Sequence, residues 1–214
     1  MRLAPNRSKS TLNSVIELVV IIAIALGLAL AIQAVLVKPY RIPSGSMEPT
    51  LSVGQRVLVN RIGMSIKGPH VGEIVVFHPP VGAQQSQCGE PKHPMTAACA
   101  APIPREDNST NFIKRVVAGP GDEMYISEGH VFRKAKGTTT FVKENDSYIK
   151  PCAPEVGVVC NLTKAIKIPP GHWFMMGDNR GESDDSRFWG PVPEGWIIGG
   201  AFFTYWPPDK IGFL

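Results

Sequence analysis

The chain has 214 residues, a formal net charge of +4 at pH 7 and 43% hydrophobic residues, which suits one domain with a packed core and a possible subdomain. Its lysines and arginines are scattered in runs of no more than two, so the composition argues against nucleic-acid binding. The 20 prolines and 21 glycines favour short strands and turns over helices.

The first predicted element is a membrane-spanning helix. Leu18–Val37 contains 20 residues without a charge, and Gln33 is its only polar side chain. As a helix this run would be about 30 Å long, which matches the hydrocarbon core of a bilayer. A cleavable signal peptide is the alternative. Because the run exceeds the usual apolar region of such a peptide, we expect a retained anchor over residues 15–37 behind a tail over residues 1–14.

Charges on either side of the anchor predict its orientation. Arg2, Arg7 and Lys9 precede the apolar run, whereas Lys38 and Arg41 follow it. The positive-inside rule therefore favours a cytoplasmic N-terminus, by a small margin.

Four cysteines follow the anchor in two local pairs, each inside a polar stretch that contains proline. Such pairs are typical of loop disulfides in an oxidising compartment, so residues 38–214 are expected to lie outside the cytoplasm. A metal site that includes His93 is one alternative, although its spacing matches no standard zinc template, and free thiols are another. The expected disulfides are Cys88–Cys99 and Cys152–Cys160.

Beyond the anchor the pattern is one of short strands and turns, and no amphipathic helix is expected. Residues 79–111 are rich in Pro, Gln and Ala without an apolar period, which predicts a long surface loop. Residues 123–170 form a β-rich excursion that is expected to be non-catalytic. The predicted strands, most of them bounded by Gly, Pro, Asn or Asp, are 56–60, 73–78, 112–117, 123–126, 130–133, 173–176 and 201–206.

The segment RIPSGSMEPTL, residues 41–51, places Ser44 and Ser46 on either side of Gly45. The prolines at both ends restrict the backbone, which would hold the two hydroxyls ready. A serine hydroxyl becomes a useful nucleophile only when a base removes its proton. None of the five histidines lies in a stretch that also supplies an obvious orienting aspartate.

Lys114 is the other candidate base. In the strand NFIKRVV it would share one face with Phe112 and Val116, and an apolar environment favours the neutral amine. Lowering its pKa from about 10.4 to about 7–8 would require roughly 3–5 kcal/mol. The simpler alternative is that Lys114 extends to the surface and stays solvated.

A dense polar block, MGDNRGESDDSRFWG, occupies residues 176–190 directly after the apolar run WFMM. Asp178 and Asn179 after Gly177 suit a tight turn, and Asp185 and Arg187 could form an ion pair. A solvated surface loop is the ordinary alternative for such a block.

Together these blocks resemble bacterial type I signal peptidases. That family carries a serine box similar to IPSGSMEPTL, a lysine box similar to IKRVVAGPGD and a late box similar to GDNRGESDDSRFWG, in this order behind an N-terminal anchor. The resemblance extends from the anchor to about Trp206 and is weakest over residues 79–111 and 123–170. It implies a mainly β fold in which two antiparallel β-sheet subdomains follow one transmembrane helix.

By this resemblance Ser46 is the nucleophile and Lys114 the general base of a Ser–Lys dyad. The family commonly has Asp-Asn where this chain has Gly181-Glu182, so the turn at this point differs. Four further residues would support the dyad: Ser44 in the oxyanion hole, Ser183 as the partner that orients the lysine, and Asp185 with Arg187 as a buttress.

The resemblance also implies a substrate class, namely exported preproteins with small residues at the first and third positions before the cut. The enzyme would remove their signal peptides through an acyl-enzyme, without a metal or other cofactor. It would act as a monomer in the bacterial inner membrane. Ser46 follows Val37 by nine residues, a reach of at most roughly 30 Å, so it would stay near the bilayer. Shallow apolar pockets would be lined by Tyr40, Ile42, Leu51, Val57, Phe112 and Ile113.

Three rival hypotheses remain open at this point. A specialised conjugation or pilus-system protease would share the dyad and cleave a narrow set of substrates. A membrane-anchored β scaffold without catalysis would fail to react with an acylating inhibitor. A soluble Ser–Lys autoprotease that resembles the SOS-response repressors would need no apolar anchor.

Overall fold

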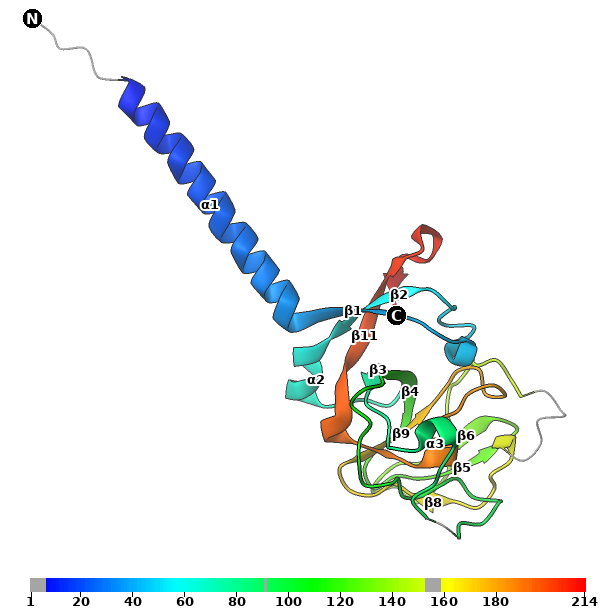
Figure 1. Cartoon of the computed structure of the whole chain (residues 1–214). Helices are drawn as coiled ribbons and strands as arrows, with labels where there is room; N and C mark the ends of the chain where they lie inside the picture. The colour runs from blue at the N-terminus through cyan, green and yellow to red at the C-terminus, as the bar shows by residue number, and fades with distance from the viewer. Residues whose placement is uncertain (1–6, 91, 153–158) are drawn as a thin grey trace, which may run out of the picture. The chain divides into compact units, whose positions relative to one another are not determined.

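The structure is a computed structural model that describes residues 7–90, 92–152 and 159–214 (Figure 1). The chain divides into two compact units, Met1–Lys38 and Pro39–Leu214. The first unit is dominated by a single helix, and the second by two antiparallel sheets. The predicted mainly β fold behind an N-terminal apolar helix is confirmed.

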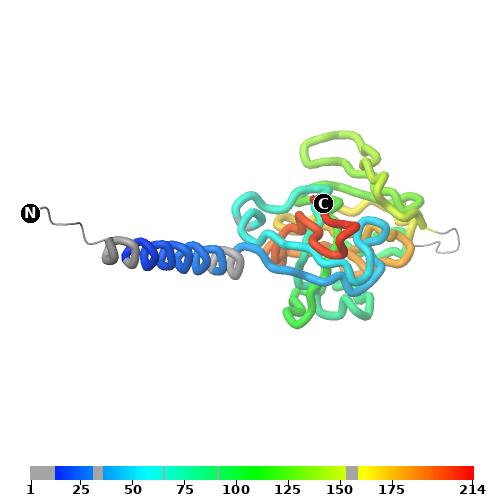
Figure 2. The backbone as a smooth tube through the Cα atoms, turned by 90° about the horizontal axis from the view of Figure 1, so that it is seen from above, coloured from blue at the N-terminus to red at the C-terminus, as the bar shows by residue number. Residues whose placement is uncertain are grey.

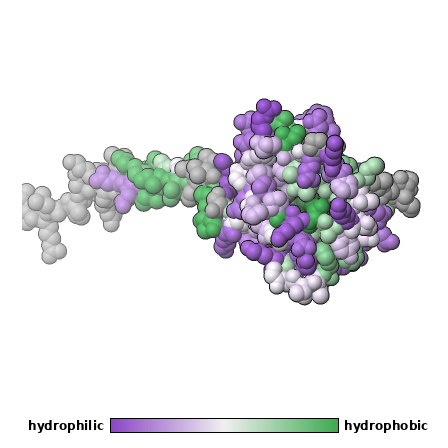
Figure 3. Space-filling view, turned by 90° about the horizontal axis from the view of Figure 1, so that it is seen from below, coloured by the Kyte–Doolittle hydropathy of each residue, from purple (hydrophilic) through white to green (hydrophobic). Residues whose placement is uncertain are grey.

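The N-terminal helix α1 covers Arg7–Leu36. Its Asn13–Leu30 segment is long and apolar enough to cross a membrane, and all side chains of that segment are exposed. Figure 3 shows the contrast between the apolar surface of the described part of this helix and the mostly polar face of the β unit. A helix that is apolar all round and exposed is suited to lipid rather than to water.

The larger sheet carries most of the predicted strands (Figure 1). Its order is β1-β2-β11-β3-β4-β9-β10, and β12 also pairs with β11. In the two longest strands, β4 and β11, buried residues occur at consecutive positions, as in a sheet that is covered on both faces. Its strands are β1 (Val37–Arg41), β2 (Arg56–Asn60), β3 (Ile74–Phe77), β4 (Phe112–Ala118), β9 (His172–Met176), β10 (Val192–Pro193), β11 (Ile197–Trp206) and β12 (Gly212–Phe213).

The smaller sheet lies within the predicted β-rich excursion and has the order β7-β6-β5-β8. Apolar side chains of this sheet, including Met124 and Ile126, share a buried cluster with Phe174 of β9. Figure 2 shows the yellow-green hairpin of this sheet at the edge of the β unit. The strands are β5 (Glu123–Ser127), β6 (His130–Lys134), β7 (Val142–Lys143) and β8 (Ile166–Lys167).

Two short helices that the sequence pattern did not indicate occur beyond the anchor. The helix α2 (Arg61–Lys67) begins where the Asn60 side chain accepts hydrogen bonds from the backbone N–H groups of Ile62 and Gly63, and α3 (Ser186–Trp189) begins at Asp185. Both are too short to show a clear apolar period in the sequence. Single-turn 3₁₀ segments, labelled η, occur at η1 (Gly45–Met47), η2 (Ala83–Gln85), η4 (Glu194–Trp196) and η5 (Pro208–Lys210).

The insertion, residues 79–111, contains no strand among its described residues apart from isolated bridges. It is nevertheless not only a surface loop, because Ala97, Ala98 and Cys99 are buried. Ala97 and Ala98 pack in the same apolar cluster as the smaller sheet. The insertion is therefore docked on the β unit.

Two disulfides join the pairs that the sequence predicts, Cys88–Cys99 and Cys152–Cys160. Mass spectrometry of the unreduced protein is expected to find no free thiol and one bond in each local pair. Each loop is short, so the chain-entropy model gives about 2–3 kcal/mol of stability per bond. Detection of four free thiols, or of crossed pairs, would contradict this prediction.

Candidate active site

The serine segment forms a tight turn that is anchored by apolar side chains. Pro43 and Ser44 lead into η1, and the N–H of Glu48, which caps the end of η1, donates to the Gly45 carbonyl at 3.1 Å. Met47 and Leu51 are fully buried in the cluster beneath this turn. Because these anchors hold the turn from both sides, the intervening hydroxyl has a fixed position.

The side chain of Ser46 meets that of Lys114 from strand β4. The Lys114 ammonium nitrogen Nζ lies 2.6 Å from the Ser46 Oγ. The two residues are only 8% and 5% exposed, respectively. A buried hydroxyl bonded to a buried amine can supply a nucleophile and the base that activates it.

Burial lowers the pKa of Lys114 to about 8, because desolvation disfavours the ammonium. The carboxylates of Asp185, Asp184 and Asp178 oppose this effect, and the Arg187 guanidinium adds to it. The neutral amine is therefore accessible near neutral pH. The alternative in which Lys114 extends to the surface does not fit this buried position.

Ser44 lies at the entrance to the same turn. Its Oγ is 3.4 Å from the Ser46 Oγ. It is the N-cap of η1, so the N–H of Ser46 lies in the first turn, where backbone donors lack acceptors within the helix. The Ser44 hydroxyl and this N–H are thus available at neighbouring positions for a developing oxyanion.

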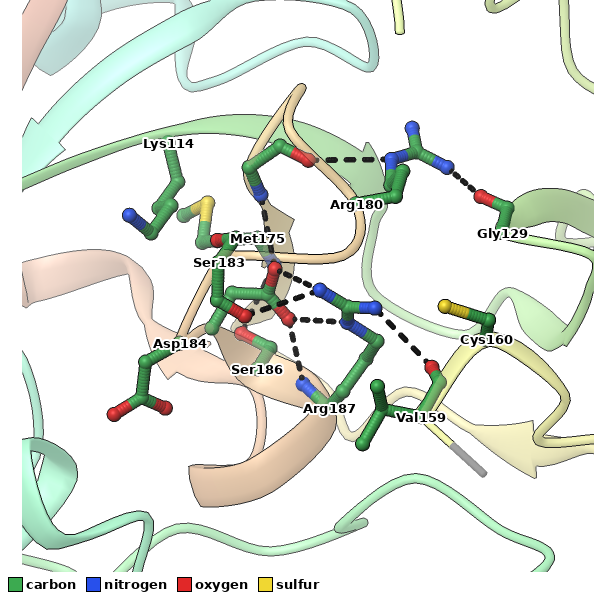
Figure 4. Close-up of polar contacts among 12 residues, drawn as sticks. Lys114, Gly129, Val159, Cys160, Met175, Arg180, Ser183, Asp184, Ser186 and Arg187 are labelled. Atoms are coloured by element: carbon green, nitrogen blue, oxygen red, sulfur yellow. Dashed lines mark hydrogen bonds and ion pairs between the residues drawn. The ribbon is translucent and has the colours of Figure 1, made fainter. Parts of the chain in front are cut away.

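The polar block of residues 176–190, called the late block below, contains a buried ion pair (Figure 4). Asp185 caps α3, and its carboxylate accepts two hydrogen bonds from the Arg187 guanidinium, at 2.8 and 2.9 Å. Burial alone would raise the pKa of Asp185, but Arg187 and the Gly177 N–H outweigh it and hold that pKa low. Arg187 also donates to the carbonyls of Ser183 and Val159. This network fixes the loop next to the serine turn.

The expected hydrogen bond between Ser183 and Lys114 is not present in the structure. The Ser183 Oγ is buried and has no hydrogen-bond partner among the described residues. A Cβ on Gly177 would clash with that hydroxyl and with the Ser46 carbonyl. Gly177 is therefore a site residue that the sequence did not reveal, since only glycine permits this close approach.

A second buried carboxylate connects the three motifs. Asp178 accepts hydrogen bonds from the Arg115 Nε and Nη2, at 2.9 and 2.7 Å, and from the Thr50 Oγ1 at 2.5 Å. The register pairs Arg115 with Met176 across β4 and β9, so Asp178 emerges from the sheet beside it. Asn179 also donates to the Gly45 carbonyl at 3.1 Å. These long-range contacts had no signal in the sequence beyond the polar character of the block.

A cleft of about 370 Å³ contains the serine–lysine pair. Of the six predicted pocket residues, Phe112 and Ile113 line this cleft. The prediction was wrong for Ile42, Leu51 and Val57, which are at most 1% exposed and belong to the apolar core beneath the turn. Tyr40 packs against the same core. The complete lining is Pro43, Ser44, Ser46, Thr110, Asn111, Phe112, Ile113, Lys114, Glu182 and Asp184.

Within the described part of the chain, no three His, Cys, Asp or Glu side chains come together as metal ligands.

This fold and site define a mainly β protein behind one apolar helix, with a paired hydroxyl and amine in a cleft. The model of the family "Signal peptidase, peptidase S26" matches residues 15–206. The chain is 34% identical to probable signal peptidase I-2 of Synechocystis sp., over 94% of this chain and 78% of the relative. It is 33% identical to probable signal peptidase I-1 of the same organism, over 92% and 86%. Signal peptidase I of Pseudomonas fluorescens is 31% identical, over 87% of this chain and 72% of the relative.

The chain therefore belongs to the signal peptidase S26 family. It is a serine endopeptidase of the class that removes signal peptides. Its N-terminal apolar helix fits a membrane-anchored enzyme.

Proposed function

We propose that this enzyme removes N-terminal signal peptides from exported preproteins with a Ser46–Lys114 dyad. The observation that carries the proposal is the 2.6 Å contact between the Lys114 Nζ and the Ser46 Oγ in a buried cleft. Ser183, Asp185 and Arg187 act as supporting residues. The reaction needs no cofactor, because a hydroxyl and a neutral amine supply both nucleophile and base.

In the first step the Ser46 Oγ attacks the scissile carbonyl carbon while Lys114 takes the hydroxyl proton. The carbonyl oxygen becomes an oxyanion that accepts hydrogen bonds from the Ser44 hydroxyl and the Ser46 N–H. Lys114 then gives the proton to the leaving amine, and an acyl-enzyme remains. Lys114 next removes a proton from water, the hydroxide attacks the ester, and Ser46 regains its proton.

The Asp185–Arg187 ion pair keeps Ser46 and Lys114 aligned. The pair is buried, and Asp185 accepts a hydrogen bond from the Gly177 N–H at 3.0 Å. Gly177 in turn permits the close approach of Ser183 to the serine turn. The Ser183 hydroxyl at this position has no hydrogen-bond partner among the described residues, and in the proposed reaction it bonds the Lys114 amine. It would orient Lys114 without adding a charge that stabilises the ammonium.

The location of the enzyme is part of the proposal. The anchor places residues 15–37 in the bacterial inner membrane, with the tail 1–14 in the cytoplasm and residues 38–214 on the far side. Two disulfides in the β unit suit that oxidising side. A preprotein held by its own apolar segment would present its cleavage site near the same surface, which reduces the entropy cost of binding. The enzyme would act as a monomer.

The pH dependence of cleavage tests the role of Lys114. Only the neutral amine acts as a base, so kcat/KM on a signal-bearing peptide is expected to rise with pH, with a midpoint at about 8. The rise should be near tenfold per pH unit well below the midpoint, because one proton must leave. A midpoint close to 10 would show a solvated lysine and would contradict the proposed base.

A further inference from the structure

The cleft contains two carboxylates that the proposed reaction does not use. Glu182 and Asp184 line it together with Ser46 and Lys114. Lys114 is the one cationic side chain in this described lining, and it must lose its proton to act as a base. In the reacting state the charged groups of the lining are therefore only negative.

The two carboxylates differ in how well their oxygens are already bonded. The Glu182 side chain is 69% exposed, accepts a hydrogen bond from the Asn179 Nδ2 at 2.9 Å, and lies 3.9 Å from the Lys150 ammonium. Asp184 is only partly exposed. Its Oδ2 accepts a hydrogen bond from the Ser86 hydroxyl at 3.2 Å, whereas its Oδ1 is buried without a partner among the described residues. Asp184 thus has one buried, unpartnered oxygen and a second oxygen that accepts a hydrogen bond only from Ser86, whereas Glu182 is largely solvated.

Asp184 is held in the cleft by the insertion, residues 79–111. Ser86 lies two residues before Cys88, whose disulfide partner Cys99 donates its backbone N–H to the Arg187 carbonyl at 3.0 Å. The insertion therefore contacts residues 176–190 at Ser86 and again at Cys99 of the disulfide. Figure 4 shows the Asp184 carboxylate apart from the contacts that surround Arg187. No direct ion pair within the described chain neutralises it.

We propose that Asp184, positioned by Ser86, is a specificity-determining residue that favours preproteins with a lysine or arginine side chain close to the scissile bond. This inference rests on the proposed function. A cationic side chain would donate a charge-assisted hydrogen bond to the carboxylate. Burial raises the pKa of Asp184, which marks a poorly solvated carboxylate whose charged form a cation would stabilise. Complementary charge in a partly dehydrated cleft also speeds association.

The test compares pairs of peptide substrates that differ by lysine or glutamine at one position, taken in turn on each side of the cut. At one position the wild-type enzyme is expected to prefer lysine by about tenfold in kcat/KM, the effect of one charge-assisted hydrogen bond. Asp184→Asn should bring that ratio close to one, and Asp184→Glu should keep most of it. Ser86→Ala should lower it in part. Glu90→Gln, an exposed charge in the same insertion, is the matched control and should leave the ratio unchanged.

The proposal is overturned if no position gives a lysine preference in the wild type, or if Asp184→Asn retains it. If Asp184→Asn does not fold, an unchanged ratio in Ser86→Ala overturns it instead. A failure of the dyad itself gives a different result, because Ser46→Ala would then still cleave the glutamine peptides.

Discussion

Replacing Ser46 with alanine is expected to reduce cleavage of a signal-bearing preprotein by about 10⁴-fold or more, because no other group supplies the nucleophile. Lys114→Ala should have a similar effect. Lys114→Arg should also fail, since the guanidinium stays protonated and cannot accept the serine proton. The fold is expected to survive in each variant, because both side chains face the cleft rather than the apolar clusters. The measurement is the rate at which a purified preprotein is converted to its shorter processed form, followed on a denaturing gel.

Two exposed positions supply matched controls for this experiment. Ser147→Ala removes a hydroxyl, and Lys167→Arg makes the same exchange as Lys114→Arg on strand β8. Both should retain full activity. Activity within tenfold of the wild type in Ser46→Ala or Lys114→Ala would refute the dyad. An acylating inhibitor should label the wild-type protein and leave Ser46→Ala unlabelled, which would also exclude a scaffold without catalysis.

Much of the fold could be predicted because its strands carry local signals. All seven predicted strands are present, with boundaries that differ by at most a few residues. The missed strands have few residues or, like β1, include a proline, and such segments carry little periodic signal. The helices α2 and α3 were missed for a related reason. Their starts depend on side-chain caps at Asn60 and Asp185 rather than on an apolar stripe.

The site was only partly predictable, because burial does not reveal what a side chain faces. Lys114 between Phe112 and Val116 was correctly expected to be desolvated. The same reasoning placed Leu51 and Val57 in a substrate pocket, yet both face the core beneath the serine turn. An apolar residue near a catalytic motif can line the cleft or pack in the core, and only the packing of the whole unit decides between these two positions.

The long-range polar contacts of the site could not be predicted from the sequence for another reason. Asp178 joins Thr50, 128 residues away in the chain, and Arg115, 63 residues away. Its partners follow from the register of β4 with β9, which no local pattern specifies. Asp184 was likewise read only as part of a polar block, and its position in the cleft depends on Ser86 of the insertion.

Replacing Lys114 with methionine is expected to abolish activity and yet stabilise the fold at pH 7. The folded protein holds the pKa of Lys114 at about 8, against an ordinary value of 10.5. Below pH 8 the amine is charged in both states, and the difference corresponds to about 3 kcal/mol of destabilisation by the buried ammonium. Methionine fills a similar volume without that charge. After the lost contact to Ser46 is subtracted, the free energy of unfolding of Lys114→Met should exceed that of the wild type by about 2 kcal/mol.

The pH dependence of this gain distinguishes desolvation from better packing. Between pH 8 and 10.5 the unfolded wild-type chain binds more protons at Lys114 than the folded protein does. The free energy of unfolding of the wild type therefore rises with pH through this window relative to that of Lys114→Met. The stability advantage of Lys114→Met should shrink towards zero. Denaturant unfolding of the full chain in detergent at pH 7 and 9.5 measures it, with Lys167→Met at an exposed position as the control. A constant gain at both pH values would indicate packing alone, and a less stable Lys114→Met variant at pH 7 would mean that the buried amine contributes more through its bonds than its desolvation costs.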